Sequence, residues 1–288
     1  MPLPAAPAKI NLFLHVGSAR ADGYHPIESL AAFADIGDDL QFEPGGDAFS
    51  IQVRGPYAED AGEPANNLVL KAAHALRRRI AIVGGGAFRL TKNLPAGAGL
   101  GGGSSDAAAA LRLLAEASGI AADNPALLEA AKETGADVAV CLERKARLVS
   151  GIGDVLSEPV AIPELDAVLV WPGVPASTPA VYRAFDGMKA PSTPPGVRAS
   201  EVSRERAAFI RFLHNQTNDL TSAAWSVTPE IAEADAALRN TDHALLIRMS
   251  GSGSTVFALH ETMERAEAEA AAIRAQYPRW WVQTAKLR

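Results

Sequence analysis

The sequence predicts an α+β protein of two domains, the second of which is a ferredoxin-like layer of helices on an antiparallel sheet. The chain has 288 residues, of which 48% are hydrophobic, and this is enough apolar material for two cores. Strand-like and helix-like segments alternate, and the chain ends on the order strand, strand, helix, strand. We therefore place one domain at residues 1–158 and the other at residues 159–288.

The first domain is predicted to mix strands and helices. Asn66 and Asn67 are typical N-cap residues, and they precede a helix that ends near Arg79. Alternating apolar residues and the turns between them predict strands at residues 9–16, 40–43, 49–53 and 87–92. The last of these strands leads directly into a glycine-rich segment.

A helix follows the glycine-rich segment and ends at a serine-glycine pair. Ser104 or Ser105 is the expected N-cap of this helix, and Asp106 adds negative charge to its first turn. The next helix is bounded by asparagine and proline at its start and by Gly135 at its end. Asp137 is therefore expected just beyond a helix C-terminus.

The second half of the chain begins with a predicted hairpin and contains one long loop. Residues 190–200 include three prolines and lack hydrophobic periodicity, so we expect a surface loop there. The other predicted segments are a hairpin at 146–159, strands at 167–171, 244–249, 255–260 and 280–285, and helices near 202–214, 217–226, 229–239 and 262–275.

Composition excludes several classes of function. A net charge of −6 opposes nucleic-acid binding, and no apolar run is long enough to span a membrane. The first residues, MPLPAAPAKINLFLH, lack the pattern of a signal peptide. The single cysteine, Cys141, lies in an apolar run and is expected in a core. We expect a cytoplasmic protein, monomeric or weakly dimeric, with no nucleic-acid or membrane partner.

Residues 95–105 read PAGAGLGGGSS and predict a phosphate-binding site. Five of these eleven residues are glycine, which lets the backbone approach a ligand and adopt positive φ angles. The N-terminus of the helix that follows offers unpaired amides and a dipole that favours negative charge. Because these donors belong to the backbone, a polyphosphate can be held there without a lysine.

Two common phosphate motifs fit this segment poorly. Gly97, Gly99 and Gly102 have the spacing of the dinucleotide fingerprint, but the acid expected downstream, Glu116, falls inside a helix. The Walker pattern fails because Gly103 stands where its lysine should be. A simple structural turn is the remaining alternative, and the length of the run argues against it.

The glycine-rich run and three other segments resemble the motifs of the galactokinase, homoserine, mevalonate and phosphomevalonate (GHMP) kinase superfamily. These segments are AKINLFLHVGSARADGYHPIESL at residues 8–30, GADVAVCL at 135–142 and MSGSGSTVFALH at 249–260. Within that superfamily, AKINLFL followed by ADGYH most closely resembles the 4-diphosphocytidyl-2-C-methyl-D-erythritol kinases. Further matches are SGIGD at 150–154, STPAVY at 177–182 and NDL at 218–220.

The resemblance implies an N-terminal domain like domain 2 of ribosomal protein S5 and a ferredoxin-like C-terminal domain. It also implies an ATP-dependent kinase that uses Mg²⁺, for which Ser104 or Ser105 is a candidate ligand. The residues that it assigns to ATP are Pro95, Ala96, Gly97, Ala98, Gly99, Leu100, Gly101, Gly102, Gly103, Ser104 and Ser105, together with Asn66 and Lys92 near the adenine.

The resemblance implies phosphorylation of the 2-hydroxyl of a cytidine diphosphate-linked methylerythritol. Asp137 would accept the hydroxyl proton, and Lys9 would keep Asp137 ionised and orient the hydroxyl. The residues that it assigns to the rest of the substrate are Tyr24 and Tyr182 on either side of the cytosine, His25 at its edge, Asn11 by the erythritol and diphosphate, and Thr178. The SGSGS loop at 250–254 would close this site.

Two other functions stay open at this point. The chain could be another small-molecule kinase of the superfamily, against which Tyr24 and His25 argue. It could instead be a catalytically silent ATP-binding regulator, which should have lost its lysine or its acid. Two positions depart from the pattern, since Ala139 stands where proline is frequent and Thr221 where an acid is common.

Overall fold

The computed structural model of the protein describes residues 3–63, 66–188, 193–240 and 243–288. The chain forms two compact units. The first contains the chain up to Lys9, Asp35–Ala96 and Gly101–Arg144, and the second contains Ile10–Ala34, Gly97–Leu100 and Lys145–Arg288. The strands β1 (Ala6–Val16) and β2 (Ile27–Pro44) contribute residues to both. The units therefore differ from the contiguous halves 1–158 and 159–288 that the sequence predicted.

The sheet of the first unit contains β3 (Phe49–Arg54), β4 (Gly86–Thr91) and the C-terminal part of β2. β4 lies in the middle, parallel to β3 and antiparallel to β2. Because parallel neighbours require a crossover connection, the chain passes through α1 (Leu68–Arg79) between β3 and β4. The four predicted strands are confirmed. β2 is much longer than expected. Most residues in its first half are buried, so buried and exposed positions do not alternate there, and a prediction that relied on alternation did not include this part of the strand.

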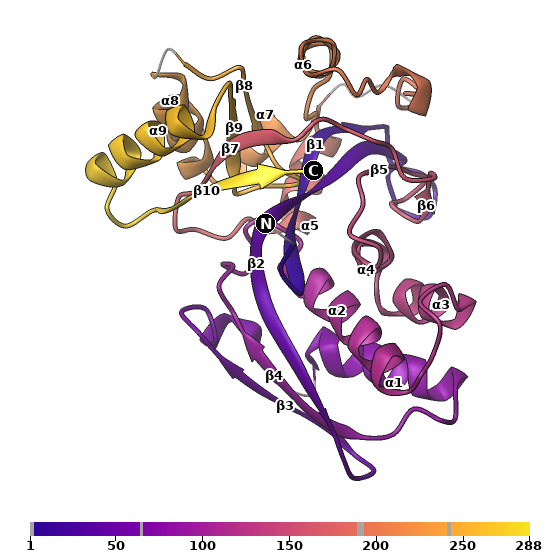
Figure 1. Ribbon diagram of the computed structural model, residues 1–288. Coiled ribbons are helices and arrows are strands. Elements are labelled where there is room, and N and C mark those ends of the chain that lie inside the picture. Colours follow the sequence, from indigo (N-terminus) through magenta and orange to yellow (C-terminus); the bar gives the residue numbers. More distant parts are fainter. Residues whose placement is uncertain (1–2, 64–65, 189–192, 241–242) are drawn as a thin grey trace. The chain divides into compact units, whose positions relative to one another are not determined.

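Three helices of the first unit lie side by side, α1, α2 (Gly102–Ala117) and α3 (Pro125–Thr134) (Figure 1). The predicted caps of α1 and α3 are confirmed, because Asn67 accepts a hydrogen bond from the amide of Val69 and Asn124 from that of Ala126. A short helix, α4 (Ala136–Cys141), follows α3 at once. Burial raises the pKa of the Cys141 thiol to about 12, as expected for a core residue.

The predicted N-cap of α2 is wrong. This helix begins at Gly102, and its N-cap is Gly101, which adopts a left-handed conformation with φ of 63°. Ser104 and Ser105 therefore lie inside the helix, and neither side chain caps it. Glycine is the residue that takes this conformation most easily, so a glycine starts this helix in place of a serine.

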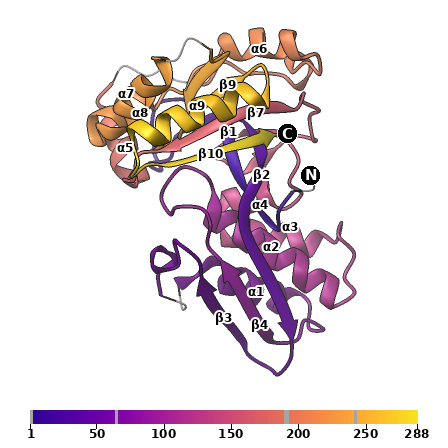
Figure 2. The same ribbon diagram turned by 60° about the vertical axis from the view of Figure 1, so that its left-hand side comes forward.

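The second unit contains the ferredoxin-like sheet. Its strands are β7 (Leu165–Trp171), β8 (Leu246–Met249), β9 (Val256–His260) and β10 (Trp281–Leu287). Their spatial order is β10-β7-β9-β8, and all neighbours are antiparallel. The helices α8 (Glu230–Arg239) and α9 (Met263–Gln276) pack against this sheet (Figure 2). The predicted ferredoxin-like architecture is confirmed.

The remaining elements of the second unit follow the prediction in part. A hairpin of β5 (Arg147–Ser150) and β6 (Val155–Leu156) pairs through β5 with the N-terminal part of β2. The helices α6 (Arg206–His214) and α7 (Thr221–Val227) were predicted, whereas α5 (Thr178–Asp186) was not. Of the predicted loop 190–200, residues 190–192 lie outside the described residues, and a 3₁₀ turn begins at Ala199. No helix in the described ranges is long and apolar enough to cross a membrane.

A buried cluster of charges joins the sheet of the first unit to α2. Lys92, which directly follows β4, donates to Asp106 on α2 at 2.8 Å and also to Asp38 on β2. The side chains of all three residues are at most 5% exposed. The other carboxylate oxygen of Asp38 accepts the amides of Asn93 and Leu94 at 2.6 and 2.8 Å. This cluster fixes the start of α2 against the end of β4.

We predict that Asp38→Ala lowers the free energy of unfolding by about 3–5 kcal/mol, because it removes one partner of a buried ion pair. Glu43→Ala is the matched control, since Glu43 lies on the same strand but pairs with Arg89 at the surface. That change should cost less than about 1 kcal/mol. Urea unfolding measures both. Equal losses in the two variants would show that the cluster does not hold this unit together.

Candidate active site

Lys9 and Asp137 form an ion pair in the first unit, as the sequence predicted. The ammonium of Lys9 donates to Oδ1 of Asp137 at 2.9 Å. The Lys9 side chain is 6% exposed because β1 is buried along its whole length, whereas the Asp137 side chain is 50% exposed. Asp137 occupies the first turn of α4, just beyond the C-cap of α3. A buried cation thus holds an accessible carboxylate in place.

The N-terminus of α2 lies beside this ion pair. A Cβ atom at Gly101 would come within 3.1 Å of Lys9 Cβ and 3.3 Å of Lys9 Cε, so the aliphatic part of Lys9 packs on the N-cap of α2. The amide of Ser105 donates to the carbonyl of Gly101 at 2.9 Å. The amides of Gly102, Gly103 and Ser104 precede it and have no acceptor within the helix. Such amides bind anions.

The two glycines that follow Gly101 have different surroundings. A Cβ atom at Gly102 would lie 3.3 Å from Lys92 Nζ and 3.4 Å from Asp38, so a side chain there would press on the buried cluster. At Gly103 the nearest atom is a methyl group of Leu68 at 3.6 Å, which is ordinary contact. Gly103 is exposed and is therefore the better position at which to probe a bound phosphate.

The remaining residues assigned to ATP in the first unit differ in accessibility. Ser104 is half-buried, whereas Ser105 is fully buried. Asn66 is exposed, and its amide donates to the carbonyl of Glu63 at 2.9 Å. Lys92 is 4% exposed and is bound to two carboxylates. Contact of Asn66 and Lys92 with adenine stays a prediction, and in this structure the ammonium of Lys92 holds the buried cluster.

In the second unit, Gly97–Leu100 packs against the SGSGS loop and its surroundings. The carbonyls of Gly97, Ala98 and Gly99 accept hydrogen bonds at 2.9–3.1 Å from Ala176, Thr255 and Ser250 respectively. A Cβ atom at Gly99 would lie 2.6 Å from the carbonyl oxygen of Ser250. Glycine is therefore required at 99 by the SGSGS loop.

Two residues assigned to the substrate also contact the SGSGS loop. The amide of Asn11 donates to Ser250 Oγ at 3.1 Å, and its side-chain amide donates to Ser29 Oγ at 2.7 Å. The hydroxyl of Thr178, the first residue of α5, lies 2.7 Å from that of Ser252. The structure therefore brings Asn11, Thr178 and the SGSGS loop together in the second unit.

The NDL segment supports this loop. The side-chain amide of Asn218 donates to the carbonyls of Met249 and Gly251, both at 2.8 Å. Asp219 accepts the amide of Val16, at the end of β1, at 2.9 Å. Thr221, which stands where an acid is common, donates through its hydroxyl to the carbonyl of Asn218 at 2.7 Å. Its polar role is therefore to fix the segment.

Aromatic residues gather around His25 in the second unit. The rings of His25 and Tyr182 are 5.0 Å apart and tilted by 46°, and Phe185 meets His25 edge-on at 5.9 Å. Tyr24 is 59% exposed. Sequence reasoning missed Asp186, whose Oδ1 lies 3.2 Å from Nε2 of His25. Helical spacing offered a signal, because Asp186 follows Tyr182 by four residues on the same face of α5.

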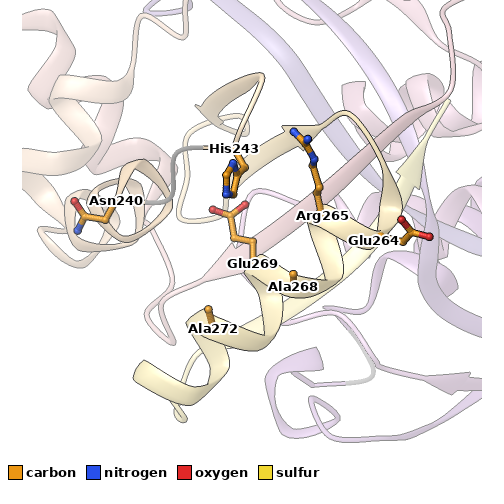
Figure 3. Close-up of a pocket in the computed structure, with 7 residues that line it drawn as sticks. All are labelled: Asn240, His243, Glu264, Arg265, Ala268, Glu269 and Ala272. Carbon is orange, nitrogen blue, oxygen red and sulfur yellow. The ribbon is translucent and has the colours of Figure 1, made fainter.

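A groove lies elsewhere in the second unit. It has a volume of about 680 Å³. Its lining residues are Asn240, His243, Glu264, Arg265, Ala268, Glu269 and Ala272, and His243 and Glu269 point toward one another (Figure 3). None of the described residues that the sequence assigned to a site lines it, so we do not take it as the candidate active site.

Comparisons with known proteins agree with this geometry. Residues 67–145 match the family model "GHMP kinases N terminal domain", and residues 204–279 match "GHMP kinases C terminal". A 4-diphosphocytidyl-2-C-methyl-D-erythritol kinase of Methylorubrum extorquens is 47% identical over 98% of this chain and 97% of its own length. The corresponding protein of Xanthobacter autotrophicus is also 47% identical, over 98% of both chains. The chain belongs to the GHMP kinase family.

Solved structures of GHMP kinases share this fold. A crystal structure of 4-(cytidine 5'-diphospho)-2C-methyl-D-erythritol kinase covers 98% of this chain and 97% of its own, with a TM-score of 0.78 and 33% identity. Mevalonate kinase of L. major, solved with R-mevalonate, has a TM-score of 0.70 at 18% identity over 98% of this chain and 94% of its own. At that identity the similarity shows the fold alone.

Asp106 is expected to make the stability of this GHMP kinase depend on pH. Burial, opposed by the Lys92 ammonium and reinforced by the Asp38 carboxylate, raises the pKa of Asp106 to about 7. The folded state therefore favours the protonated carboxyl, and this contribution to stability is lost as pH rises from the unfolded pKa near 4 through about 7.

We predict that the Tm of Asp106→Asn, which mimics the neutral carboxyl, is higher relative to the unmodified protein at pH 8 than it is at pH 5. Each 1 kcal/mol corresponds to about 2–4 °C. Thermal unfolding of both proteins at the two pH values measures the difference. A gap that stays constant between pH 5 and pH 8 would mean that Asp106 does not titrate in this window.

Proposed function

We propose that the protein uses ATP to phosphorylate the 2-hydroxyl of 4-diphosphocytidyl-2-C-methyl-D-erythritol, in the non-mevalonate route to isoprenoid precursors. The names of relatives 47% identical over 98% of the chain support this function. One structural observation in particular supports this function. The carboxylate of Asp137 is held by Lys9, whose side chain packs on the amide-rich N-terminus of α2. Phosphoryl transfer requires a positioned proton acceptor and a site that neutralises phosphate charge.

In this reaction the residues of the first unit carry the chemistry. Asp137 accepts the proton of the attacking hydroxyl, and Lys9 holds the carboxylate and orients the hydroxyl. The amides of Gly102, Gly103 and Ser104 donate to phosphate oxygens, and the dipole of α2 favours the negative charge. Backbone donors are already in place before the reaction, so little reorganisation is required when charge develops.

The residues of the second unit bind the rest of the substrate. Tyr24 and Tyr182 stack on the cytosine, with His25 at its edge. Asn11 and Thr178 contact the methylerythritol and diphosphate, and the SGSGS loop holds both residues in position. The assignment rests on the grouping of Tyr182 with His25 and of Asn11 with Thr178.

Magnesium, when bound with ATP, neutralises phosphate charge. The described residues hold no group of three His, Cys, Asp or Glu side chains suited to a metal ion. Mg²⁺ commonly takes few protein ligands and several phosphate oxygens, and the half-buried hydroxyl of Ser104 fits such a site better than the buried Ser105. We also place the protein in the cytoplasm, where a free buried thiol such as Cys141 stays reduced.

The direct test is to incubate the protein with 4-diphosphocytidyl-2-C-methyl-D-erythritol, ATP and Mg²⁺ and to identify the product by NMR. We expect a phosphate on the 2-hydroxyl and stoichiometric ADP. Homoserine and mevalonate, tested in a coupled ADP assay, should not react. Turnover of either one in place of the cytidine substrate would replace this proposal with another kinase of the superfamily.

We predict that Asp137→Asn lowers kcat by about 10²–10⁴, the usual contribution of a positioned base. Half of the Asp137 side chain is exposed, so the variant should fold and bind ATP. Calorimetry checks the binding, and Glu129→Gln on the surface of α3 is the control. A folded Asp137→Asn variant with normal turnover would remove Asp137 from the mechanism.

We predict that Gly103→Ala weakens ATP binding about tenfold or more, because a methyl group would occupy space beside the phosphates. Tm should not fall, since alanine favours a helix over glycine by about 0.5–1 kcal/mol and the nearest neighbour is 3.6 Å away. Gly84→Ala, with no atom within 4 Å of the added Cβ, is the control. Unchanged ATP affinity in Gly103→Ala would place the phosphates elsewhere.

A further inference from the structure

The side chain of Asn11 is held by a buried serine of the second unit. Asn11 lies on β1 and Ser29 on β2, and these two strands pair with one another. The side-chain nitrogen of Asn11 lies 2.7 Å from the hydroxyl oxygen of Ser29. The same hydroxyl oxygen lies 2.6 Å from the carbonyl oxygen of Phe13. Ser29 is fully buried, and Asn11 is 7% exposed.

The single hydroxyl hydrogen of Ser29 decides which way the Asn11 amide faces. The carbonyl of Phe13 can only accept, so the hydroxyl of Ser29 donates its hydrogen there. The Ser29 oxygen therefore offers Asn11 a lone pair, which only the NH₂ end of the amide can meet. With the two ends of the amide exchanged, two oxygens would face one another with no hydrogen between them, which is costly in a buried place.

The oxygen end of the Asn11 amide borders the SGSGS loop. A Cβ atom at Gly251 would lie 3.3 Å from Oδ1 of Asn11. The backbone amide of Asn11 donates to Ser250 Oγ at 3.1 Å, which fixes β1 beside the same loop. Apart from strand pairing, the hydrogen bonds of Asn11 within the described ranges use its two nitrogen atoms. Oδ1 therefore remains as an acceptor in a fixed position.

We propose that Ser29 is a positioning residue, which orients the Asn11 amide so that Oδ1 accepts a hydrogen bond from a hydroxyl group of the methylerythritol. This inference rests on the proposed function and selects one of the two substrate parts assigned to Asn11. A hydroxyl can donate to an amide oxygen, whereas an ionised diphosphate oxygen only accepts and would meet Oδ1 with no hydrogen between them. Ser29 is fully buried and acts through Asn11.

The test compares ligands with and without the methylerythritol in the intact protein. We measure binding of the cytidine substrate and of CDP by calorimetry without ATP, together with kcat and KM. Ser29→Ala leaves the Asn11 amide free to turn, so it should weaken binding of the cytidine substrate and raise its KM about 2- to 10-fold. CDP binding and the KM for ATP should stay unchanged. Ser29→Thr keeps the hydroxyl and should restore binding of the cytidine substrate.

A double-mutant cycle separates positioning from packing. In an Asn11→Ala background, Ser29→Ala should cause no further loss of substrate binding, because Ser29 acts through Asn11. Ser226→Ala is the matched control, since the Ser226 hydroxyl also donates to a carbonyl, that of Ala223 at 2.8 Å on α7. This control should leave binding of both ligands intact. Circular dichroism and Tm show whether each variant is folded, and Ser29→Cys, whose sulfur is a weak acceptor, replaces Ser29→Ala if alanine prevents folding.

The outcomes separate this inference from the proposed function. If Ser29→Ala weakens binding of CDP as much as that of the cytidine substrate, Asn11 binds the diphosphate through its second amide hydrogen and the inference is overturned. Unchanged binding of both ligands, or losses that add in the double variant, would also overturn it. If Ser29→Ala selectively weakens binding of the cytidine substrate but the unmodified protein does not phosphorylate that substrate, the positioning role stands and the proposed function fails.

Discussion

The contact between Gly101 and Lys9 is the constraint on which the candidate active site depends. Gly101 is left-handed at the start of α2, a conformation that favours glycine, and a Cβ there would come within 3.1 Å of the Lys9 side chain. The same lysine reaches Asp137 at 2.9 Å. One glycine therefore sets the start of a helix, the path of a buried cation and the position of the candidate base. A side chain at this position would disturb all three.

The proposed phosphate site does not depend on the ammonium of Lys92. Lys92 is the obvious cation near the glycine-rich run, yet its ammonium is bound by Asp38 and Asp106. The proposed phosphate site relies instead on backbone amides and the dipole of α2, which act locally even in a chain with a net charge of −6. The buried lysine contributes indirectly, because it holds the helix whose amides would bind the phosphates.

The glycine-rich run has two parts, of which Gly97–Leu100 belongs to the second unit and Gly101–Gly103 to the first. Gly97 and Gly99 are positioned by Ala176 and by the SGSGS loop of the second unit, and a side chain at Gly99 would strike the backbone of that loop. Gly101 packs against Lys9 and Gly102 against the buried cluster of the first unit. Gly103 is exposed, and a Cβ there would make only an ordinary contact with Leu68 at 3.6 Å. Most of these glycines are thus required by close packing, and only part of the run is free to meet a ligand.

The sequence by itself determined most of the strands and helices and the ferredoxin-like ending, because periodicity and cap residues are local properties of the chain. The pairing of Lys9 with Asp137, which are 128 residues apart, was implied by the resemblance to GHMP kinases. Sequence reasoning misplaced the N-cap of α2, and it did not reveal that Lys92 is buried between two carboxylates. It also missed Asp186 beside His25. These features depend on residues distant in sequence, such as Asp38 and Lys92, and only tertiary packing decides which side chains meet and which remain exposed.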